Sequence, residues 1–402
     1  MKIMNILAAG STLVLSAFCL HAIEPAVEFD LSQQDKPATV KVLLAKSAPE
    51  ALVDVRGSYE IFDPATNLGI FVGRLGSFHF VTPTDSGINW GDHNLGSNQL
   101  RIVPTSSQTT ILINGIQYRG CVEIYNVNGE LNVINEVDVE NYLKSTLTLQ
   151  FPKEKDAEVL DAVAIVARTQ AYYYIARNPG VFWHVEANKV GYEGYAIVLQ
   201  NTHVDRAVES TRHMVMTYKD TPFAATWTKN SAGKTATFAS IFRKDVQTPS
   251  GVAAPLALRD KEESHWTYSL SKGQLANLVK TSKMTKIDLF SDKESSKVYA
   301  VRVHNGKAFQ DIDFFHLQNA LGTEKLKSNE FTVKVKGDQI VFDGYGEGHG
   351  VGLCLYSAAK MSAKGLKAKD ILTAFFPHMQ LRNMREPQAE ATSPAAEAVS
   401  AN

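Results

Sequence analysis

The stretch that decides the fold is EIYNVNGELNVI, residues 123–134. Two runs of strand-forming residues flank Asn128-Gly129, a pair favoured in two-residue hairpin turns because both turn residues must take positive φ. The same pattern lies just before it, where TTILI (109–113) and IQY (116–118) flank Asn114-Gly115. Two hairpins so close together predict an antiparallel β-rich region from about Thr39 to Glu136.

The apolar period becomes helical after Phe151-Pro152. Acidic residues lie near the start of the next stretch, at Glu154, Asp156 and Glu158, where they complement a helix dipole, and Asn178-Pro179-Gly180 ends it. We therefore expect a helix over 154–177, whose many alanines permit close packing at the centre of the fold. The fold class is α+β: a β-rich scaffold with a central Ala-rich helix.

Weaker patterns place further elements. They predict a helix over 204–214, a strand-turn-strand around Lys219-Asp220, a hairpin over 331–342 and a helix over 357–364 before Gly365. Residues 236–330 carry a helical pattern at 272–283 and a strand pattern at 298–303, and they indicate no function.

Composition limits the class of protein. The chain has 402 residues, 44% of them hydrophobic and 21% charged, which is typical of a globular protein. Its net charge is −1, and phosphate binding needs a basic surplus, so nucleic acid is excluded as the main partner.

The N-terminal residues resemble a secretory signal. Lys2 precedes the uncharged apolar run 3–20, and His21-Ala22 leads into polar sequence, which predicts a signal peptide over 1–22. A retained anchor and a lipoprotein processed at Cys19 are the alternatives. We expect an exported protein, periplasmic or in the cell envelope, with no stable membrane span after cleavage. Residues 386–402 lack a core-forming pattern and predict a disordered tail.

The mature chain keeps two cysteines, Cys121 and Cys354. They are either one disulfide or two separate buried thiols. Two thiols are too few for a metal site of cysteine ligands. No cofactor is predicted.

The segment 344–352, GYGEGHGVG, holds five glycines in nine residues. Such a cost in backbone entropy indicates positive φ or a close approach of another chain. Neither the phosphate-loop nor the dinucleotide-binding pattern is present. His349, enclosed by glycines, is either a donor to a ligand or a structural side chain.

Five motifs in order resemble the SpoIID/LytB family, the stage II sporulation protein D and amidase-enhancer group. The motifs are VDVENYL (137–143), QFP (150–152) with AVAIVART (162–169), YEG (192–194), SAGKT (231–235) and GEGHGVGL (346–353). The resemblance covers roughly residues 40–382. It implies a lytic transglycosylase acting on peptidoglycan glycan strands that have lost their stem peptides.

The resemblance also assigns residues. The family's catalytic acid is the Glu of an E-M-P motif, and Gln150 occupies that position here. An amide hydrogen-bonds to a sugar but cannot transfer a proton, so the family mechanism is impaired unless another acid replaces it. Glu140, Glu154, Asp156 and Glu347 are the nearby acids by sequence.

The expected site combines two groups. Gln150 and His349 are the catalytic-position residues. The substrate-binding residues are Arg168, Tyr172, Lys229, Ser231, Gly233, Gly346, Gly348 and Gly350. Relatives that bind zinc do so just before the Y-x-G element, and residues 185–191 offer no such ligands, so no metal is predicted there.

The domain prediction is a signal peptide at 1–22, a β-rich part at 23–136, a SpoIID/LytB-like core at 137–385 and a tail at 386–402. Two functions remain open, beside a third possibility that both are lost and the protein is a structural relative. One is an exported cell-wall protein that cleaves glycan strands by an altered mechanism. The other is an inactive glycan-binding module that recruits or enhances an amidase or division partner.

Overall fold

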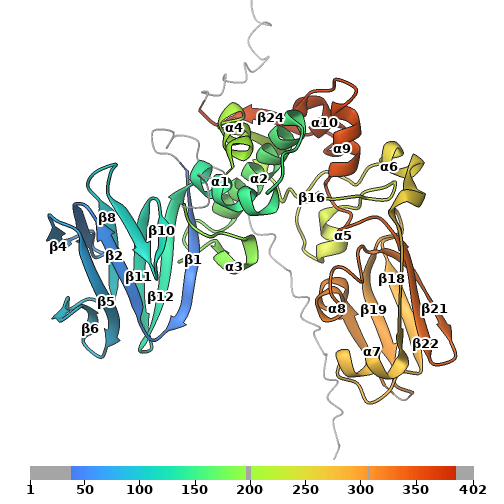
Figure 1. The fold of residues 1–402 in the computed structure, drawn as a ribbon, viewed down its shortest axis with the longest axis horizontal. Helices are drawn as coiled ribbons and strands as arrows, with labels where there is room; N and C mark the ends of the chain where they lie inside the picture. The colour runs from blue at the N-terminus through green and yellow to red at the C-terminus, as the bar shows by residue number, and fades with distance from the viewer. Residues whose placement is uncertain (1–37, 196–200, 307, 386–402) are drawn as a thin grey trace, which may run out of the picture.

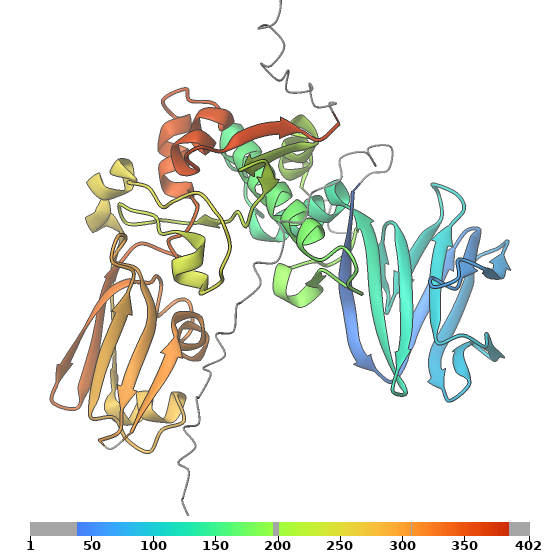
Figure 2. The same cartoon turned by 180° about the vertical axis from the view of Figure 1, so that it is seen from behind.

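The computed structural model describes residues 38–195, 201–306 and 308–385. The signal peptide and tail expected from the sequence lie outside these residues. The fold is mixed α+β, as predicted, with the N-terminal strands and a second β-rich unit on opposite sides of a helical middle (Figures 1 and 2). Within the described ranges, no helix has the length and apolarity needed to cross a membrane.

Two sheets build the N-terminal part, and their strands pair antiparallel except for β13, which pairs in parallel with β1. The larger has the order β13-β1-β12-β11-β8-β3-β4, and the smaller β10-β9-β2-β5-β6-β7. The strands of the first are β1 Thr39–Ala48, β3 Tyr59–Phe62, β4 Gly69–Gly73, β8 Gln99–Pro104, β11 Cys121–Val127, β12 Glu130–Asp138 and β13 Val185–Glu186. Those of the second are β2 Ala51–Arg56, β5 Ser77–Thr84, β6 Gly87–Trp90, β7 His93–Asn94, β9 Thr110–Ile113 and β10 Ile116–Tyr118.

Both predicted hairpins are confirmed. β11 pairs with β12 and β9 with β10, and the four turn residues all have positive φ: Asn114, Gly115, Asn128 and Gly129. Alternate side chains of the strands are buried, as in β2, where Ala51, Val53 and Val55 face the interior. The two sheets therefore bury one face each against the other.

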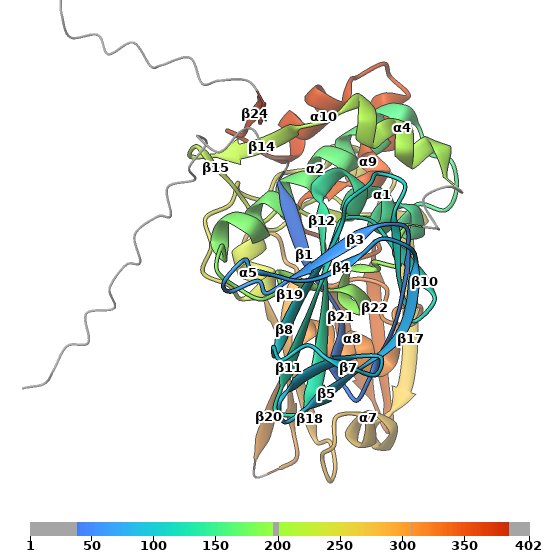
Figure 3. The ribbon, with the colours of Figure 1, turned by 90° about the vertical axis from the view of Figure 1, so that its left-hand side faces the viewer.

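Helices occupy the middle. They are α1 Val139–Gln150, α2 Ala157–Arg177, α3 Ala187–Val190 and α4 Thr202–Ser210, and Figure 3 shows α2 and α4 above one end of the strands. The predicted helix over 154–177 begins three residues later, because the Asp156 side chain accepts from the Glu158 amide and caps α2. The predicted second helix ends at Ser210, since Met214 already begins strand β14.

The end of the chain returns to these helices. Helices α9 Leu355–Ser362 and α10 Ala368–Phe375 pack against α2. Strand β24 Gln380–Asn383 pairs with β14 Met214–Tyr218, which forms the predicted strand-turn-strand with β15 Thr221–Pro222. β16 Trp227–Thr228 pairs in parallel with β23 Leu353–Cys354.

Most of the chain between β16 and β23 forms a second β-rich unit. After α5 Phe238–Phe242, α6 Pro255–Arg259 and the 3-10 turn Lys261–Ser264 come β17 His265–Ser271, α7 Lys272–Leu278, β18 Lys286–Ser291, β19 Val298–His304, β20 Phe309–Asp313, α8 Phe314–Leu321, β21 Glu330–Lys336 and β22 Gln339–Tyr345. Residues 266–342 bury a separate apolar cluster that includes Phe314, Leu326, Ile340 and Phe342. The stretch without a sequence signal therefore has its own core, which we name the inserted unit (residues 265–345).

Candidate functional site

A cleft of about 920 Å³ lies where the end of α1, the α1–α2 loop, β16, the 3-10 turn, the glycine-rich segment and α9 meet. Its lining residues are Gln150, Phe151, Pro152, Lys153, Lys155, Asp156, Val159, Trp227, Lys229, Asn230, Glu263, Ser264, His265, Lys327, Gly346, Glu347, Leu355, Tyr356, Ala359 and Lys360. These residues precede the inserted unit in the sequence, lie within it, or follow it. We refer to this feature as the cleft.

Gln150 lies in the cleft as the last residue of α1. Its side chain is exposed and makes no hydrogen bond to any described residue. Phe151 ends the helix, donating its amide to the Leu147 carbonyl at 2.8 Å, and its ring lies 5.9 Å from that of Trp227. The amide of Gln150 is therefore free to bind a ligand beside an aromatic wall.

The glycine-rich segment docks on the chain that follows β16. Asn230 and Glu347 exchange two backbone hydrogen bonds of 2.9 Å, and the Thr228 hydroxyl donates to the Glu347 carbonyl at 3.1 Å. Gly346 has φ +82°, and a Cβ there would lie 2.6 Å from the Asn230 carbonyl oxygen. Only glycine permits this approach, which places Glu347 and Lys229 on the cleft wall.

Each carboxylate of the cleft already has a partner. Glu347 lies 2.5 Å from the Lys229 ammonium, and Asp156 caps α2 and accepts from Ser362. The Tyr356 hydroxyl hydrogen-bonds to Glu263 at 3.2 Å, and on its other side to Asp260 at 2.7 Å. No cleft carboxylate among the described residues is hydrogen-bonded to Gln150.

His349 does not line the cleft. It is partly buried, with its ring 5.2 Å from that of Phe242, and burial lowers its pKa to about 4. Its Nδ1 accepts from the Val351 amide at 3.2 Å, which leaves the hydrogen on Nε2, 3.4 Å from the Thr226 hydroxyl. The predicted catalytic-position histidine is therefore neutral near pH 7 and stabilises the glycine-rich segment.

Four predicted binding residues lie behind the cleft wall. Ser231 is fully buried, its amide 3.4 Å from the thiol of Cys354, and its carbonyl accepts from Lys297 at 2.6 Å. Gly233 packs against Leu258, Gly348 against Thr228 and Gly350 against Lys297. They shape the wall through backbone packing. Both Cys354 and Cys121 are free thiols.

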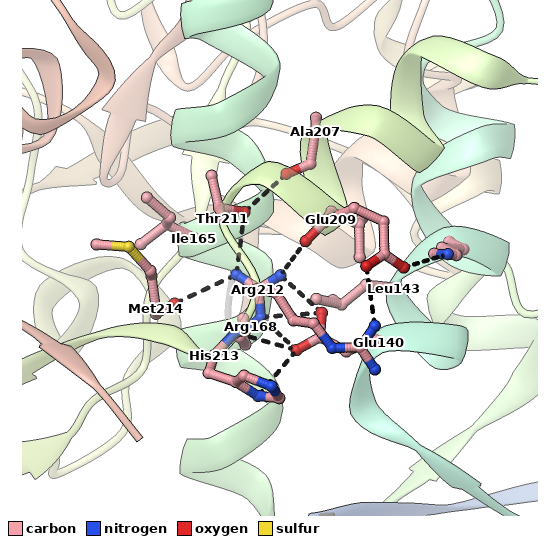
Figure 4. Close-up of polar contacts among 12 residues, drawn as sticks. Glu140, Leu143, Ile165, Arg168, Ala207, Glu209, Thr211, Arg212, His213 and Met214 are labelled. Carbon is pink, nitrogen blue, oxygen red and sulfur yellow. Dashed lines mark hydrogen bonds and ion pairs between the residues drawn. The ribbon is translucent and has the colours of Figure 1, made fainter. Parts of the chain in front are cut away.

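Arg168 lies in the interior. Its side chain is 0% exposed and forms a bidentate ion pair with Glu140 (Figure 4). It also donates to the Thr211 hydroxyl and to the carbonyls of Val208 and Met214. Arg168 therefore does not line the cleft, because its donors are used inside the protein. The sequence did not reveal that Glu140 would supply the opposite charge.

Tyr172 lies one turn further along α2 and is also buried. Burial, with a smaller contribution from the charge of Glu140, raises its pKa to about 12. It does not line the cleft. Of the ten predicted site residues, the structure brings three together at the cleft: Gln150, Lys229 and Gly346.

The sequence did not predict four other residues that line the cleft. Tyr356 lies three residues after the glycine-rich motif, while Glu263, His265 and Lys327 come from the region that gave no signal. An aromatic residue next to the motif was the available sign for Tyr356. Nothing local marks the other three, because their place depends on how the inserted unit docks.

Comparisons with known proteins agree with the motifs. Residues 127–218 match the family model described as SpoIID, stage II sporulation protein. An uncharacterised protein of Chlamydia pneumoniae is 34% identical over 179 residues, 44% of this chain and 65% of that protein, so the chain spans less than two thirds of that relative's length.

Two Bacillus subtilis relatives have functional names. Stage II sporulation protein D is 24% identical over 62% of this chain and 75% of its own length. The amidase enhancer is 25% identical over 72% of this chain and 48% of its own length.

Proposed function

We propose that this chain, whose residues 127–218 match the SpoIID family model, is an exported cell-wall protein whose cleft binds peptidoglycan glycan strands. The names of its relatives, a sporulation protein and an amidase enhancer, support a role at the wall. The cleft supports a sugar ligand, since the partly exposed rings of Trp227 and Tyr356 line it together with polar groups that can hydrogen-bond to hydroxyls.

The observation that carries the proposal is Gln150 at the cleft end of α1. A lytic transglycosylase needs one carboxylic acid that protonates the glycosidic oxygen and later recovers the proton. Gln150 cannot do this, and the cleft carboxylates are engaged by Lys229, Ser362 and Tyr356. Binding without strand cleavage is therefore the function that the geometry supports best, with an amidase or division protein as the partner that would act on the bound strand.

A second candidate, cleavage by an altered mechanism, has one favourable observation. Glu263 lines the cleft and its carboxylate is held by Tyr356, so a carboxyl group does face the ligand space. In that case Glu263 would replace the acid that Gln150 lacks.

The test uses the purified protein and glycan strands stripped of stem peptides. We expect the protein to sediment with the strands and to release no 1,6-anhydro products detectable by mass spectrometry. Trp227→Ala should weaken binding by about tenfold, since loss of one stacking ring costs about 1 kcal/mol or more. Trp183→Ala, at another partly buried tryptophan that packs against Leu43, Tyr125 and Ile134, is the matched control.

Other outcomes separate the candidates. If the wild type releases 1,6-anhydro products and Glu263→Gln abolishes them, the protein is an enzyme and the binding-only proposal is wrong. If neither the wild type nor Gln150→Glu binds strands, the glycan proposal itself is wrong.

A further inference from the structure

The N-terminal part contains a second cavity, separate from the cleft. Its volume is about 460 Å³, and it lies where the end of β8, the loop before β9 and the turn between β10 and β11 meet. No described residue lines both this cavity and the cleft. A cavity of this size can hold a small organic molecule.

Arg119 supplies the positive charge of this second cavity. It is the one charged residue among the described residues that line it, and it forms no ion pair with a described carboxylate. Its guanidinium carbon lies 4.1 Å from the centre of the Tyr195 ring, and no described side chain accepts a hydrogen bond from it. The cation–π contact therefore holds the guanidinium in place without using it in an ion pair.

Buried side chains fix the turn that carries Arg119. The amide nitrogen of Asn135, which is fully buried, donates to the Arg119 carbonyl at 2.8 Å and to the Cys121 carbonyl at 2.9 Å. The Tyr192 hydroxyl in turn donates to the Asn135 amide oxygen at 2.6 Å. The main chain on both sides of Gly120 is thus held by a hydrogen-bonded network inside the protein.

The YEG motif at 192–194, of which no residue lines the cleft, positions the Tyr195 ring. A Cβ at Gly194 would lie 2.4 Å from the Gln117 carbonyl oxygen, and the Tyr195 amide donates to the same oxygen at 2.7 Å. Only glycine allows the motif to pack so closely on β10. The motif therefore helps to build the second cavity.

Neutral donors accompany the one positive charge. Ser106 and Ser107 are exposed, line the cavity and donate no hydrogen bond to a described residue. Tyr118 also lines it, and burial, with a smaller contribution from the charge of Glu193, raises its pKa to about 12, so its hydroxyl stays protonated. One guanidinium with neutral hydroxyls matches a ligand group that has a single negative charge and two acceptor oxygens.

We propose that the second cavity binds the carboxylate of a small organic acid or of a chain end, and that Arg119 pairs with it. A guanidinium and a carboxylate can form two parallel hydrogen bonds. Val103 and Pro104 offer partly exposed apolar surface to the group that carries the carboxylate. Two sources supply such a group, the C-terminus of a peptide and a sugar acid. The inference is independent of the function proposed for the cleft.

The experiment follows the Arg119 Nε–H resonance of the full protein by NMR, identified as the signal that disappears in Arg119→Gln. The probes are N-acetyl-L-alanine, the amide of N-acetyl-L-alanine, glucuronate and inorganic phosphate. We expect N-acetyl-L-alanine to shift the signal saturably and its amide to bind about tenfold more weakly or worse, because the amide loses a charge-assisted pair. The difference should shrink at high salt.

The comparison of the two carboxylates identifies the source. Tighter binding of N-acetyl-L-alanine than of glucuronate supports a peptide end, and the reverse order supports a sugar acid. Either order supports a carboxylate site.

Variants test the residues by isothermal titration with the tighter carboxylate. Arg119→Gln should lose measurable binding, whereas Arg74→Gln, at an exposed arginine outside the cavity, should keep the wild-type affinity. Tyr195→Leu should weaken binding by about threefold, the effect of losing the cation–π contact that positions Arg119. Tyr195→Phe keeps the ring and should bind like the wild type.

Three results would overturn the inference. One is the absence of a saturable shift with either carboxylate, and another is equal affinity for N-acetyl-L-alanine and its amide. The third is tighter binding of phosphate than of both carboxylates, which would assign Arg119 to a phosphate group. None of these results would bear on strand binding at the cleft, which is measured separately by sedimentation.

Discussion

Single residues decide what chemistry the cleft can perform. Gln150 differs from Glu by one amide nitrogen, yet it can neither donate a proton to a leaving oxygen nor recover it. Arg168, in contrast, is not available to a ligand, because its guanidinium donates to Glu140 and to groups between residues 208 and 214. Side-chain type alone did not distinguish the exposed amide from the buried guanidinium.

His349 gives the structure a pH dependence. Its folded pKa is about 4, below the value near 6.5 of an unfolded chain, so the unfolded state binds the proton more tightly. The stabilisation is complete above pH 6.5 and is lost as the pH falls toward 4. Between pH 7 and pH 5 the wild type should lose about 2 kcal/mol of unfolding free energy from this group.

The measurement is urea unfolding at both pH values. His349→Asn keeps an acceptor near the Nδ1 position for the Val351 amide but does not titrate. The variant should therefore lose about 2 kcal/mol less than the wild type over the same interval. An equal loss in both proteins would show that His349 does not carry the pH dependence.

At the scale of elements, the glycine-rich segment acts as a strand-like connector that needs close backbone contact. Its bridge from Glu347 to Asn230 joins two residues that are 117 positions apart in sequence. The sequence predicted that the glycines serve a close approach. It could not say that the approaching partner is the SAGKT region of the same chain rather than a ligand.

Gly346→Ala tests this connector. The new Cβ would lie 2.6 Å from the Asn230 carbonyl oxygen at a residue with φ +82°, so the bridge must open. We expect a loss of about 2 kcal/mol or more in unfolding free energy, together with weaker strand binding. Both are measured on one preparation, by urea unfolding and by sedimentation with strands.

The control is Gly337→Ala in the β21–β22 turn. That glycine also has positive φ, +59°, but nothing lies within 4 Å of its new Cβ. The substitution should lower the unfolding free energy only by the cost of a left-handed backbone conformation at alanine, about 1 kcal/mol, and leave strand binding unchanged. Similar effects on binding in the two variants would contradict the role assigned to Gly346.

At the scale of the whole molecule, two apolar cores support the cleft. One runs from the N-terminal sheets through α2 to α10, and the other lies within the inserted unit. The cleft is lined by Gln150 at the end of α1 and by His265 and Lys327 of the inserted unit. The inserted unit should therefore open locally without unfolding the sheets.

Phe342→Ala tests the independence of the two cores. Phe342 is fully buried in the inserted unit, and its truncation should cost that unit about 3–5 kcal/mol. Hydrogen exchange followed by mass spectrometry should show faster exchange in residues 265–345 and unchanged protection of β11 and β12. Ile124→Ala, in the N-terminal core, should give the reverse pattern. Faster exchange throughout the chain after Phe342→Ala would mean that the two cores unfold as one.

Local sequence was enough to predict the two Asn-Gly hairpins, the Ala-rich helix α2, the β21–β22 hairpin and the resemblance of the motifs to the SpoIID family. These follow from turn residues, apolar period and order along the chain, which act over a few neighbouring positions. Only the tertiary structure decided which motif residues meet. Arg168 and Tyr172 are buried, and His349 and Ser231 do not line the cleft, whereas Glu263, Lys327 and Tyr356 line it together with Gln150. Burial and ion pairing depend on contacts between residues that are far apart in sequence. Local sequence patterns carry no information about those contacts.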